Sequence, residues 1–246
     1  MGRVSLNFKF PDTNDGLRRA IKQAEEVCRD SIPTRFNLAD FCFTGLLHAI
    51  TEVGKSILLL CRNGRHHDAS ILLRSQMEHL VALMVLESDS EYTDTLLLEN
   101  AKKVRTALFQ AESGNPFSEG ISDLPNFEQN LLDWQNTYED LARNGAKSHK
   151  LQDLFRKAGL SDLYETGYRS LSSLVHPSIA GMQKRSLKIN PSKDTVEFNL
   201  KQTAPEETVY LVLNSSISTI CQATQIVASR ISGSATSEHP VYRSSR

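Results

Sequence analysis

The side chains best suited to chemistry lie in residues 162–179, whose sequence is DLYETGYRSLSSLVHPSI. Arg169 and His176 are seven residues apart, and positions seven apart on an α-helix nearly eclipse, because each residue turns the helix by about 100°. The guanidinium of an Arg is a permanent cation that can hold a phosphate with several donors. The imidazole of a His titrates near neutral pH and can carry a proton. The pair therefore suits phosphodiester chemistry.

RNA is the phosphodiester that fits such a pair best, because its 2′-hydroxyl is a built-in nucleophile. A His that moves the proton and an Arg that stabilises the developing charge are then sufficient, and no metal is required. The other interpretation is structural. A His before a proline at a helix end often hydrogen-bonds a carbonyl or complements the helix dipole, and Arg169 then forms an ion pair with Glu165, four residues earlier. Both interpretations stay open at this point.

The spacing predicts two different faces on this helix. One is a polar file made of Glu165, Arg169, Ser172 and His176. The other begins with Tyr164 and Tyr168 and continues with apolar residues at steps of three and four. We expect the aromatic face to pack inward.

A second charged pair lies in the apolar segment ILLRSQMEHLVALMVL, residues 71–86, where Arg74 and Glu78 are four apart. A charged residue in such a segment is costly unless it is paired. One interpretation is a buried ion pair that fixes the register of the helix. The other is that Arg74 or Glu78 orients Arg169 or His176 from across a bundle, in the supporting role that polar sites require.

Metal and cofactor motifs are absent from the sequence. The four cysteines are Cys28, Cys42, Cys61 and Cys221. They are far apart and form no C-x-x-C pair, which argues against a zinc site. His66, His67 and Asp68 are adjacent and would point in different directions on a helix. There is no Gly-rich phosphate loop, G-x-S-x-G or H-E-x-x-H, so we expect no metal and no cofactor.

The composition is that of a globular protein, with 39% hydrophobic and 23% charged residues. The formal net charge is −1, so any site for a polyanion must be local. The N-terminus lacks the apolar region of a signal peptide. The longest uninterrupted apolar run, Leu80–Leu86, is too short to span a bilayer. We therefore expect a cytoplasmic protein that does not enter a membrane.

The fold that must position these residues is predicted to be all-α. Apolar residues at steps of three and four, with Gly, Pro or Asn at the ends, predict eight helices. They cover about residues 12–29, 38–62, 69–87, 90–112, 127–143, 150–158, 161–176 and 205–232. Alternating residues around a Pro-Ser-Lys-Asp turn predict an appended β-hairpin at about residues 185–200. We expect one domain, a helical bundle of about six to eight helices over residues 1–233, and a disordered Ser-rich tail over residues 234–246.

A resemblance rests on two of these segments. ASILLRSQMEHLVALMVL, followed about ninety residues later by LYETGYRSLSSLVHPSI, resembles a family of bacterial helical proteins of unknown function. That family has an Arg-x-x-x-Glu pair in a central apolar helix, then a Tyr-x-x-x-Tyr, a Ser, and a His before Pro or Ser. The matching positions are Arg74, Glu78, Tyr164, Tyr168, Ser172 and His176. The resemblance spans roughly residues 38–229 and implies a fold rather than an activity.

The spacing of Arg169 and His176, with six residues between them, is also similar to the signature of the HEPN superfamily, which is an Arg, four to six residues, and then a His on one helix. Many of those small helical bundles are metal-independent ribonucleases in toxin–antitoxin, CRISPR and phage-defence systems, often with a site completed across a dimer. The resemblance implies that Arg169 binds the scissile phosphate and that His176 is the general acid or base. It also implies RNA as substrate, a homodimer, and a protein partner such as an antitoxin or a defence-complex subunit. Here Ser170 follows the Arg, where Asn is common, and Pro177 follows the His.

Two alternatives to a ribonuclease stay open. A non-catalytic interaction protein of a defence or regulatory complex would enclose Arg169 and His176 as a polar core, whereas an enzyme would open them to a cleft. A bundle that binds a small molecule or nucleotide would use its Tyr and Arg side chains as a pocket, and a ligand near Tyr168 would favour it.

Overall fold

The computed structural model describes residues 13–31, 37–118, 120–175, 187–190, 195–198 and 206–235. Its contacts divide the chain into two compact units. The first unit comprises residues 1–84 and 155–246, and the second comprises residues 85–154. The prediction of one domain over residues 1–233 stays a prediction.

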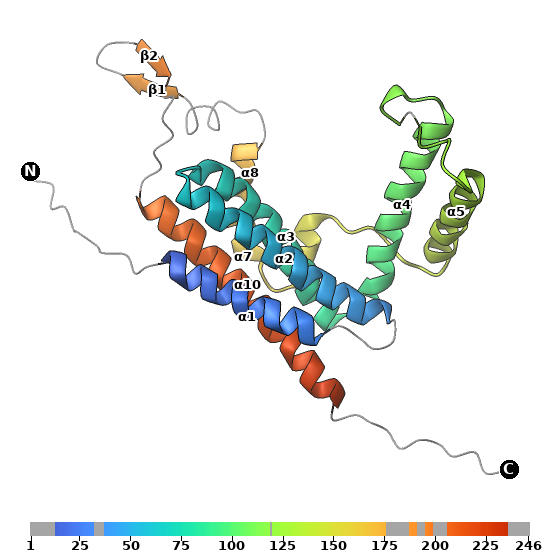
Figure 1. Ribbon diagram of the computed structural model, residues 1–246, viewed down its shortest axis with the longest axis horizontal. Helices are drawn as coiled ribbons and strands as arrows, with labels where there is room; N and C mark the ends of the chain where they lie inside the picture. The colour runs from blue at the N-terminus through green and yellow to red at the C-terminus, as the bar shows by residue number, and fades with distance from the viewer. Residues whose placement is uncertain are drawn as a thin grey trace, which may run out of the picture. The chain divides into compact units, whose positions relative to one another are not determined.

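The fold is an all-α bundle, as the sequence predicts (Figure 1). The helices at the N-terminal end are α1 (Thr13–Asp30), α2 (Leu38–Arg62), α3 (His66–Ser88) and α4 (Tyr92–Glu112). They are followed by the 3₁₀ helix η1 (Pro116–Ser118), α5 (Phe127–Arg143), α6 (Leu151–Lys157) and α7 (Ser161–Leu163). The π-helix η2 (Tyr164–Tyr168), α8 (Arg169–Val175) and α10 (Glu206–Ala235) come last.

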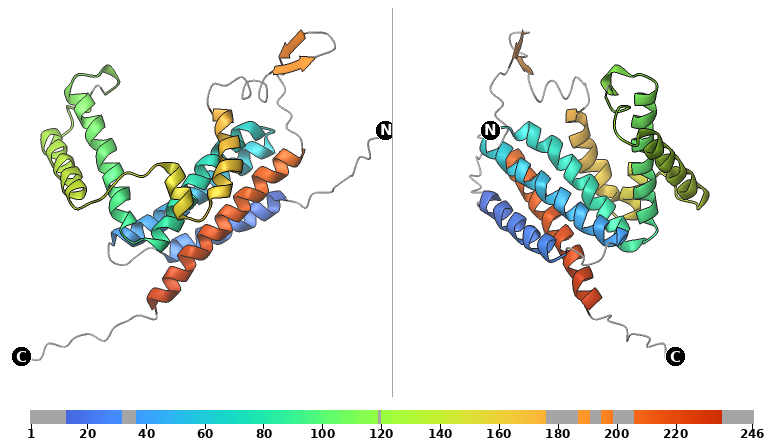
Figure 2. Two further views of the ribbon diagram at one scale, coloured as in Figure 1. Left: turned by 180° about the vertical axis from the view of Figure 1, so that it is seen from behind. Right: turned by 45° about the vertical axis from the view of Figure 1, so that its right-hand side comes forward.

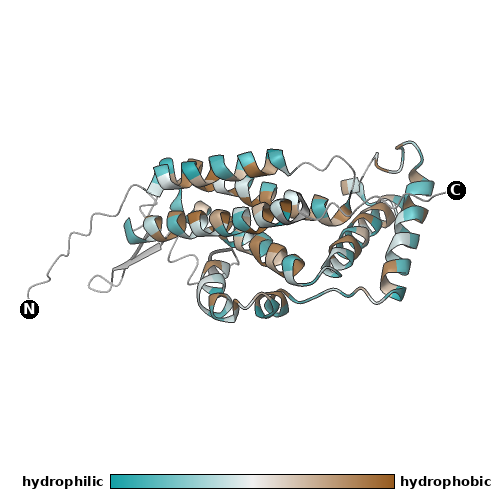
Figure 3. Cartoon of the chain, turned by 90° about the horizontal axis from the view of Figure 1, so that it is seen from below, coloured by the Kyte–Doolittle hydropathy of each residue, from teal (hydrophilic) through white to brown (hydrophobic). Residues whose placement is uncertain are grey.

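Helices α1, α2 and α10 pack against one another in the first unit, and Figures 1 and 2 show α1 and α10 side by side. Leu17, Ile21 and Ala24 are buried on α1, at the steps of four and three that put them on one face. Each large apolar side chain buried this way stabilises the fold by about 1.5–3 kcal/mol. Figure 3 shows hydrophobic residues (brown) interspersed with hydrophilic residues (teal) along the helices, as expected of helices with one apolar side.

Helix α3 is central to this unit, as its nearly continuous apolar sequence predicts. Leu73, Leu80 and Leu83 are buried. Gln76 is also buried, and its Nε2 donates to the backbone oxygen of Ile50 on α2 at 2.9 Å. This hydrogen bond uses the amide nitrogen of the Gln76 side chain and connects α3 to α2.

Helices α2 and α3 are each long and apolar enough to cross a membrane, judged by length and composition alone. In α3, 61% of the most apolar window is buried inside the structure. The core helix of a soluble protein passes the same test, because a helix apolar on all sides is usually covered by other helices. The expectation that the chain does not enter a membrane stays a prediction.

The second unit is built on α4 and α5, which pack together. The guanidinium carbon of Arg105 lies 4.1 Å from the ring centroid of Tyr138. Arg105 also donates to Gln135 at 3.2 Å. This cation–π contact and hydrogen bond fix α4 against α5.

Most helix ends agree with the sequence, and two differ. α2 has its predicted bounds because Asn37 accepts a hydrogen bond from the Ala39 amide, and Gly64 takes a positive φ of 72° after the helix. α3 begins at His66, so Asp68 is not its cap but lies in the first turn and pairs with Arg65. α10 continues to Ala235, which places residues 234–235 of the predicted tail in a helix. Residues 236–246 lie outside the described part.

The predicted β-hairpin is confirmed. Strands β1 (Leu187–Asn190) and β2 (Thr195–Phe198) pair antiparallel, with Leu187 opposite Phe198 and Asn190 opposite Thr195. The alternation of residue types in the sequence that predicted the strands falls within residues 187–190 and 195–198.

Gly54 marks the closest approach of α2 to its neighbours. A Cβ atom there would lie 2.6 Å from Cδ1 of the buried Ile220 and 3.1 Å from Nε2 of Gln76. Overpacking costs about 1–3 kcal/mol and Ala recovers about 0.5–1 kcal/mol of helix propensity, so Gly54→Ala should lower the free energy of unfolding by about 1 kcal/mol. Gly45→Ala is the matched control, because its Cβ meets nothing within 4 Å, and it should stabilise the fold. Urea unfolding followed by circular dichroism measures both, and equal effects of the two variants would contradict the packing.

Candidate functional site

The segment that carries Arg169 is not the single α-helix that the sequence predicts. It is divided into α7, the π-helix η2 over Tyr164–Tyr168, and α8 from Arg169 to Val175. In a π-helix the hydrogen bonds run from residue i to i+5, so each turn is wider and the faces are rotated relative to an α-helix. His176 lies outside the described residues.

Tyr164 and Tyr168 are the first and last residues of η2. Their rings stack with centroids 5.3 Å apart and planes 13° apart. Phe155 of α6 lies against both, at 5.2 Å from Tyr164 and 5.1 Å from Tyr168, and it is fully buried. The three rings form one aromatic cluster that joins η2 to α6. The prediction that the aromatic face packs inward is confirmed for Tyr168, which is only 4% exposed.

The hydroxyl of Tyr168 is the centre of a polar network with α3. It donates to Oε1 of Glu78 at 2.6 Å and accepts from Nε of Arg74 at 2.8 Å. Arg74 and Glu78 are themselves paired at 3.1 Å. The guanidinium carbon of Arg74 lies 5.0 Å from the centroid of the Tyr168 ring. The network thus fixes Tyr168, and with it the start of α8, to the central helix.

The electrostatics of this network hold its charges constant near neutral pH. Burial and the hydrogen bond to Glu78 raise the pKa of Tyr168 to about 12. Burial lowers the pKa of Arg74, but the hydrogen bond to Tyr168 and the charge of Glu78 outweigh it, so the net shift is upward. Tyr168 therefore stays neutral and Arg74 stays charged, which suits groups that position others rather than transfer protons.

Replacing Tyr168 with Phe removes the hydroxyl and keeps the ring. We expect a loss of about 1–2 kcal/mol in the free energy of unfolding, because the partly buried Arg74 and Glu78 each lose a hydrogen-bond partner. Urea unfolding measures the loss, and Tyr164→Phe is the matched control. The raised pKa of Tyr168 adds stability below pH 10, which disappears as the pH rises toward 12. The Phe variant should lack that decline, and a decline of the same size in both proteins would contradict the assignment.

Arg169 lies at the surface, at the first residue of α8. Its guanidinium is 64% exposed and donates to Oε2 of Glu165 at 2.7 Å. The ion pair that the sequence allowed is therefore present. Arg74 and Glu78 bind Tyr168 rather than Arg169 itself, so their support reaches Arg169 through its neighbour in the chain. Ser172 is half-buried on α8.

Two parts of this site are not visible in the sequence. Phe155, which packs on both tyrosines, is an ordinary apolar position of a short helix. The hydrogen bonds from Tyr168 to α3 join residues 90 and 94 positions apart, and no local spacing reports such a contact. The paired Tyr-x-x-x-Tyr was the only available signal.

A metal site finds no support in the described part of the chain. No group of three or more His, Cys, Asp or Glu side chains there is placed to hold a metal ion. The expectation that no metal is used stays a prediction, because His176 and its surroundings are outside that part.

The charges of the chain are divided between its two units. Residues 85–154 contain 6 Lys or Arg and 13 Asp or Glu, a net charge of −7, and the rest contains 22 and 16, a net charge of +6. The near-zero total therefore hides a basic unit and an acidic one. Arg169 belongs to the basic unit, which is the unit that would attract a polyanion.

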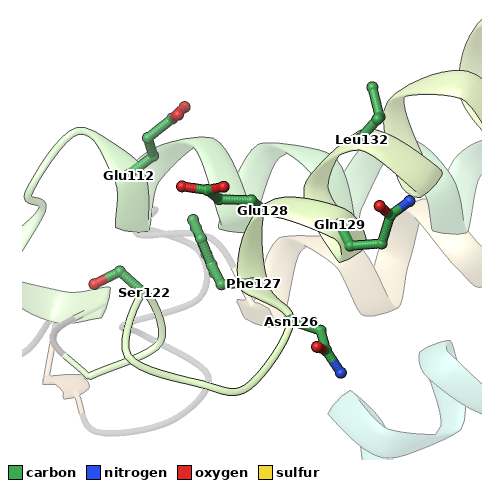
Figure 4. Close-up of a pocket in the computed structure, with 7 residues that line it drawn as sticks. All are labelled: Glu112, Ser122, Asn126, Phe127, Glu128, Gln129 and Leu132. Atoms are coloured by element: carbon green, nitrogen blue, oxygen red, sulfur yellow. The ribbon is translucent and has the colours of Figure 1, made fainter.

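A cavity in the acidic unit is a poor site for RNA. It has a volume of about 700 Å³, and Figure 4 shows Glu112 and Glu128 at its edge with Phe127 and Leu132. Its lining contains two carboxylates and no cation, so it repels phosphate.

Comparisons with known proteins identify a family for this chain and no individual similar protein. Residues 40–194 match the family described as "Family of unknown function (DUF5677)". The match includes Arg74, Glu78 and residues 164–176, so the expected resemblance to a family of unknown function is confirmed. Neither the curated proteins nor the solved structures gave a significant match, and the similarity to HEPN ribonucleases stays a prediction. The chain belongs to the family of unknown function DUF5677.

Proposed function

We propose that this chain cleaves RNA without a metal ion, with Arg169 as the phosphate-binding residue and His176 as the proton-transfer residue. The observation that carries the proposal is the placement of Arg169. Its guanidinium is on the surface of the basic unit, where a phosphate has access to it. A planar guanidinium can donate two parallel hydrogen bonds to phosphate oxygens.

The frame around Arg169 supports the same role. Tyr168, the residue before it, is held by Arg74 and Glu78 on the central helix. A side chain whose backbone is fixed in this way loses less conformational entropy when it binds a phosphate. His176 follows Val175, the last residue of α8, in the chain. The two residues of the proposed site are therefore the first residue of α8 and the residue directly after it.

The proposed reaction is a transesterification within the RNA. The 2′-oxygen attacks the neighbouring phosphorus as it loses its proton, and the bond from phosphorus to the 5′-oxygen breaks. The departing 5′-oxygen gains a proton, which leaves a 2′,3′-cyclic phosphate and a 5′-hydroxyl. His176 acts in one of the two proton transfers, as general base or general acid. Arg169 stabilises the extra negative charge on the non-bridging oxygens.

A non-catalytic interaction protein is the second candidate, and the ion pair between Arg169 and Glu165 favours it. A phosphate must compete with that carboxylate, which already occupies the guanidinium at 2.7 Å. Glu165→Gln separates the two candidates. It removes the competing charge, so a ribonuclease should bind RNA more tightly, whereas a protein that does not use Arg169 for RNA should be unaffected.

The direct test is incubation of the purified full chain with mixed RNA, with and without EDTA. Cleavage that EDTA leaves unchanged supports the proposal, and RNA that stays intact in both samples contradicts it. A homodimer, a cytoplasmic location, and a partner such as an antitoxin or a defence-complex subunit belong to the same proposal. Sedimentation of the purified chain tests the dimer.

A further inference from the structure

A groove between α1 and α2 lies apart from the candidate site, because Arg169 is not among the residues that line it. It encloses about 320 Å³. Its floor is apolar, with Ile21 of α1 and Leu58 and Leu59 of α2. Leu59 is 63% exposed, so a large apolar side chain lies open to solvent beside the charged residues of the groove.

The lining side chains follow helical stripes on both helices. On α1 they occupy positions 18, 21, 22 and 25, and on α2 positions 55, 58, 59 and 62. Each set has the spacing i, i+3, i+4 and i+7, so each lies on one face of its helix. Two such faces side by side form the kind of groove that receives a third amphipathic helix.

The rim of the groove is basic. Arg18, Lys22, Lys55 and Arg62 line it, against the single carboxylate of Glu25. Lys55 is held by Glu25 at 2.7 Å and Arg18 by Asp15 at 3.0 Å. Lys22 and Arg62 are exposed, and the described residues provide no ion-pair or hydrogen-bond partner for either side chain. These two cations are available to a ligand.

We propose that the α1–α2 groove binds an acidic amphipathic helix of a partner protein. Apolar side chains of the partner cover Leu58 and Leu59, and its carboxylates pair with Lys22 and Arg62. Charge complementarity selects an acidic occupant. The apolar floor favours a protein over RNA, because leucine side chains have no hydrogen-bond donor or positive charge for a phosphate. The carboxylate of Glu25 also repels phosphate. This inference is independent of RNA cleavage.

A synthetic helical peptide with leucines at steps of three and four and glutamates beside them is the probe. Its binding to the full chain is measured by fluorescence anisotropy at low and high salt. We expect saturable binding that weakens with salt, because the rim pairs are exposed. Lys22→Glu with Arg62→Glu should weaken binding at least about tenfold, and Leu59→Ser should weaken it about tenfold.

The controls match the variants in charge and exposure. Lys102→Glu with Lys103→Glu changes the same charge on exposed residues of α4, and Leu211→Ser removes an equally exposed leucine of α10. Both should leave binding unchanged. Three results would overturn the proposal: no binding at up to about 1 mM peptide, equal binding of a scrambled peptide of the same charge, or a loss of RNA affinity in the Lys22 and Arg62 variant without a loss of peptide affinity.

Discussion

His176→Ala is expected to lower the rate of RNA cleavage by about 10²–10⁴-fold, the usual contribution of a positioned general acid or base. Arg169→Ala is expected to lower it by about 10²–10³-fold, because the charge that develops on the phosphate then loses its stabilising donor. The measurement is the initial rate on an end-labelled RNA in EDTA. Neither change should alter the circular dichroism spectrum, since Arg169 is exposed.

Two matched variants test whether the loss of any exposed Arg or His would lower the rate of RNA cleavage in the same way. Arg143→Ala removes another exposed Arg that is paired with a nearby carboxylate, Asp140, at 2.8 Å. His48→Ala removes an exposed His of α2. Both should cleave RNA like the unaltered chain. If all four variants have the same rate, the activity comes from another site or from a contaminant, and the roles of Arg169 and His176 are wrong.

Phe155→Ala is expected to cause the largest loss of stability, about 3–5 kcal/mol, because a fully buried ring is replaced by a cavity. The loss should exceed that of an ordinary core position, since the ring also lies against Tyr164 and Tyr168. Phe155→Leu keeps most of the volume and should cost less than about 1.5 kcal/mol. Urea unfolding followed by circular dichroism measures both.

The location of this loss can be checked with the single tryptophan. Trp134 belongs to the unit of residues 85–154, whereas Phe155 packs against η2 in the other unit. If circular dichroism shows the loss of stability and the fluorescence of Trp134 does not, the loss belongs to the unit that carries the candidate site. A change below about 1 kcal/mol for Phe155→Ala would contradict the aromatic packing.

Local signals in the sequence were sufficient for most of the fold. The bounds of α2 and α5 are those predicted, because an Asn-Gly pair follows each helix and its Gly takes the positive φ of a C-terminal cap. The Arg74–Glu78 pair was also predictable, since residues four apart on a helix are neighbours. These features depend on residues close together in the sequence.

The π-helix over Tyr164–Tyr168 was not predictable, because the spacing of apolar residues gives the faces of a regular α-helix and carries no signal for a wider turn. A helical wheel assumes a constant rotation per residue, which η2 does not have. Its hydrogen bonds to α3 also join residues that are distant in the sequence. For the same reason the sequence could place Arg74 and Glu78 near the candidate site but could not name Tyr168 as their partner. The division of charge between the two units was hidden because a net charge averages over the whole chain.

The most direct measurement of the central claim uses one labelled RNA strand and the DNA strand of the same sequence, each incubated with the full chain in EDTA. A reaction that uses the 2′-hydroxyl as nucleophile should cut the RNA to fragments ending in a 2′,3′-cyclic phosphate and leave the DNA intact. RNA that stays whole, RNA that is cut only when Mg²⁺ is restored, or DNA that is cut equally well would contradict cleavage by Arg169 and His176.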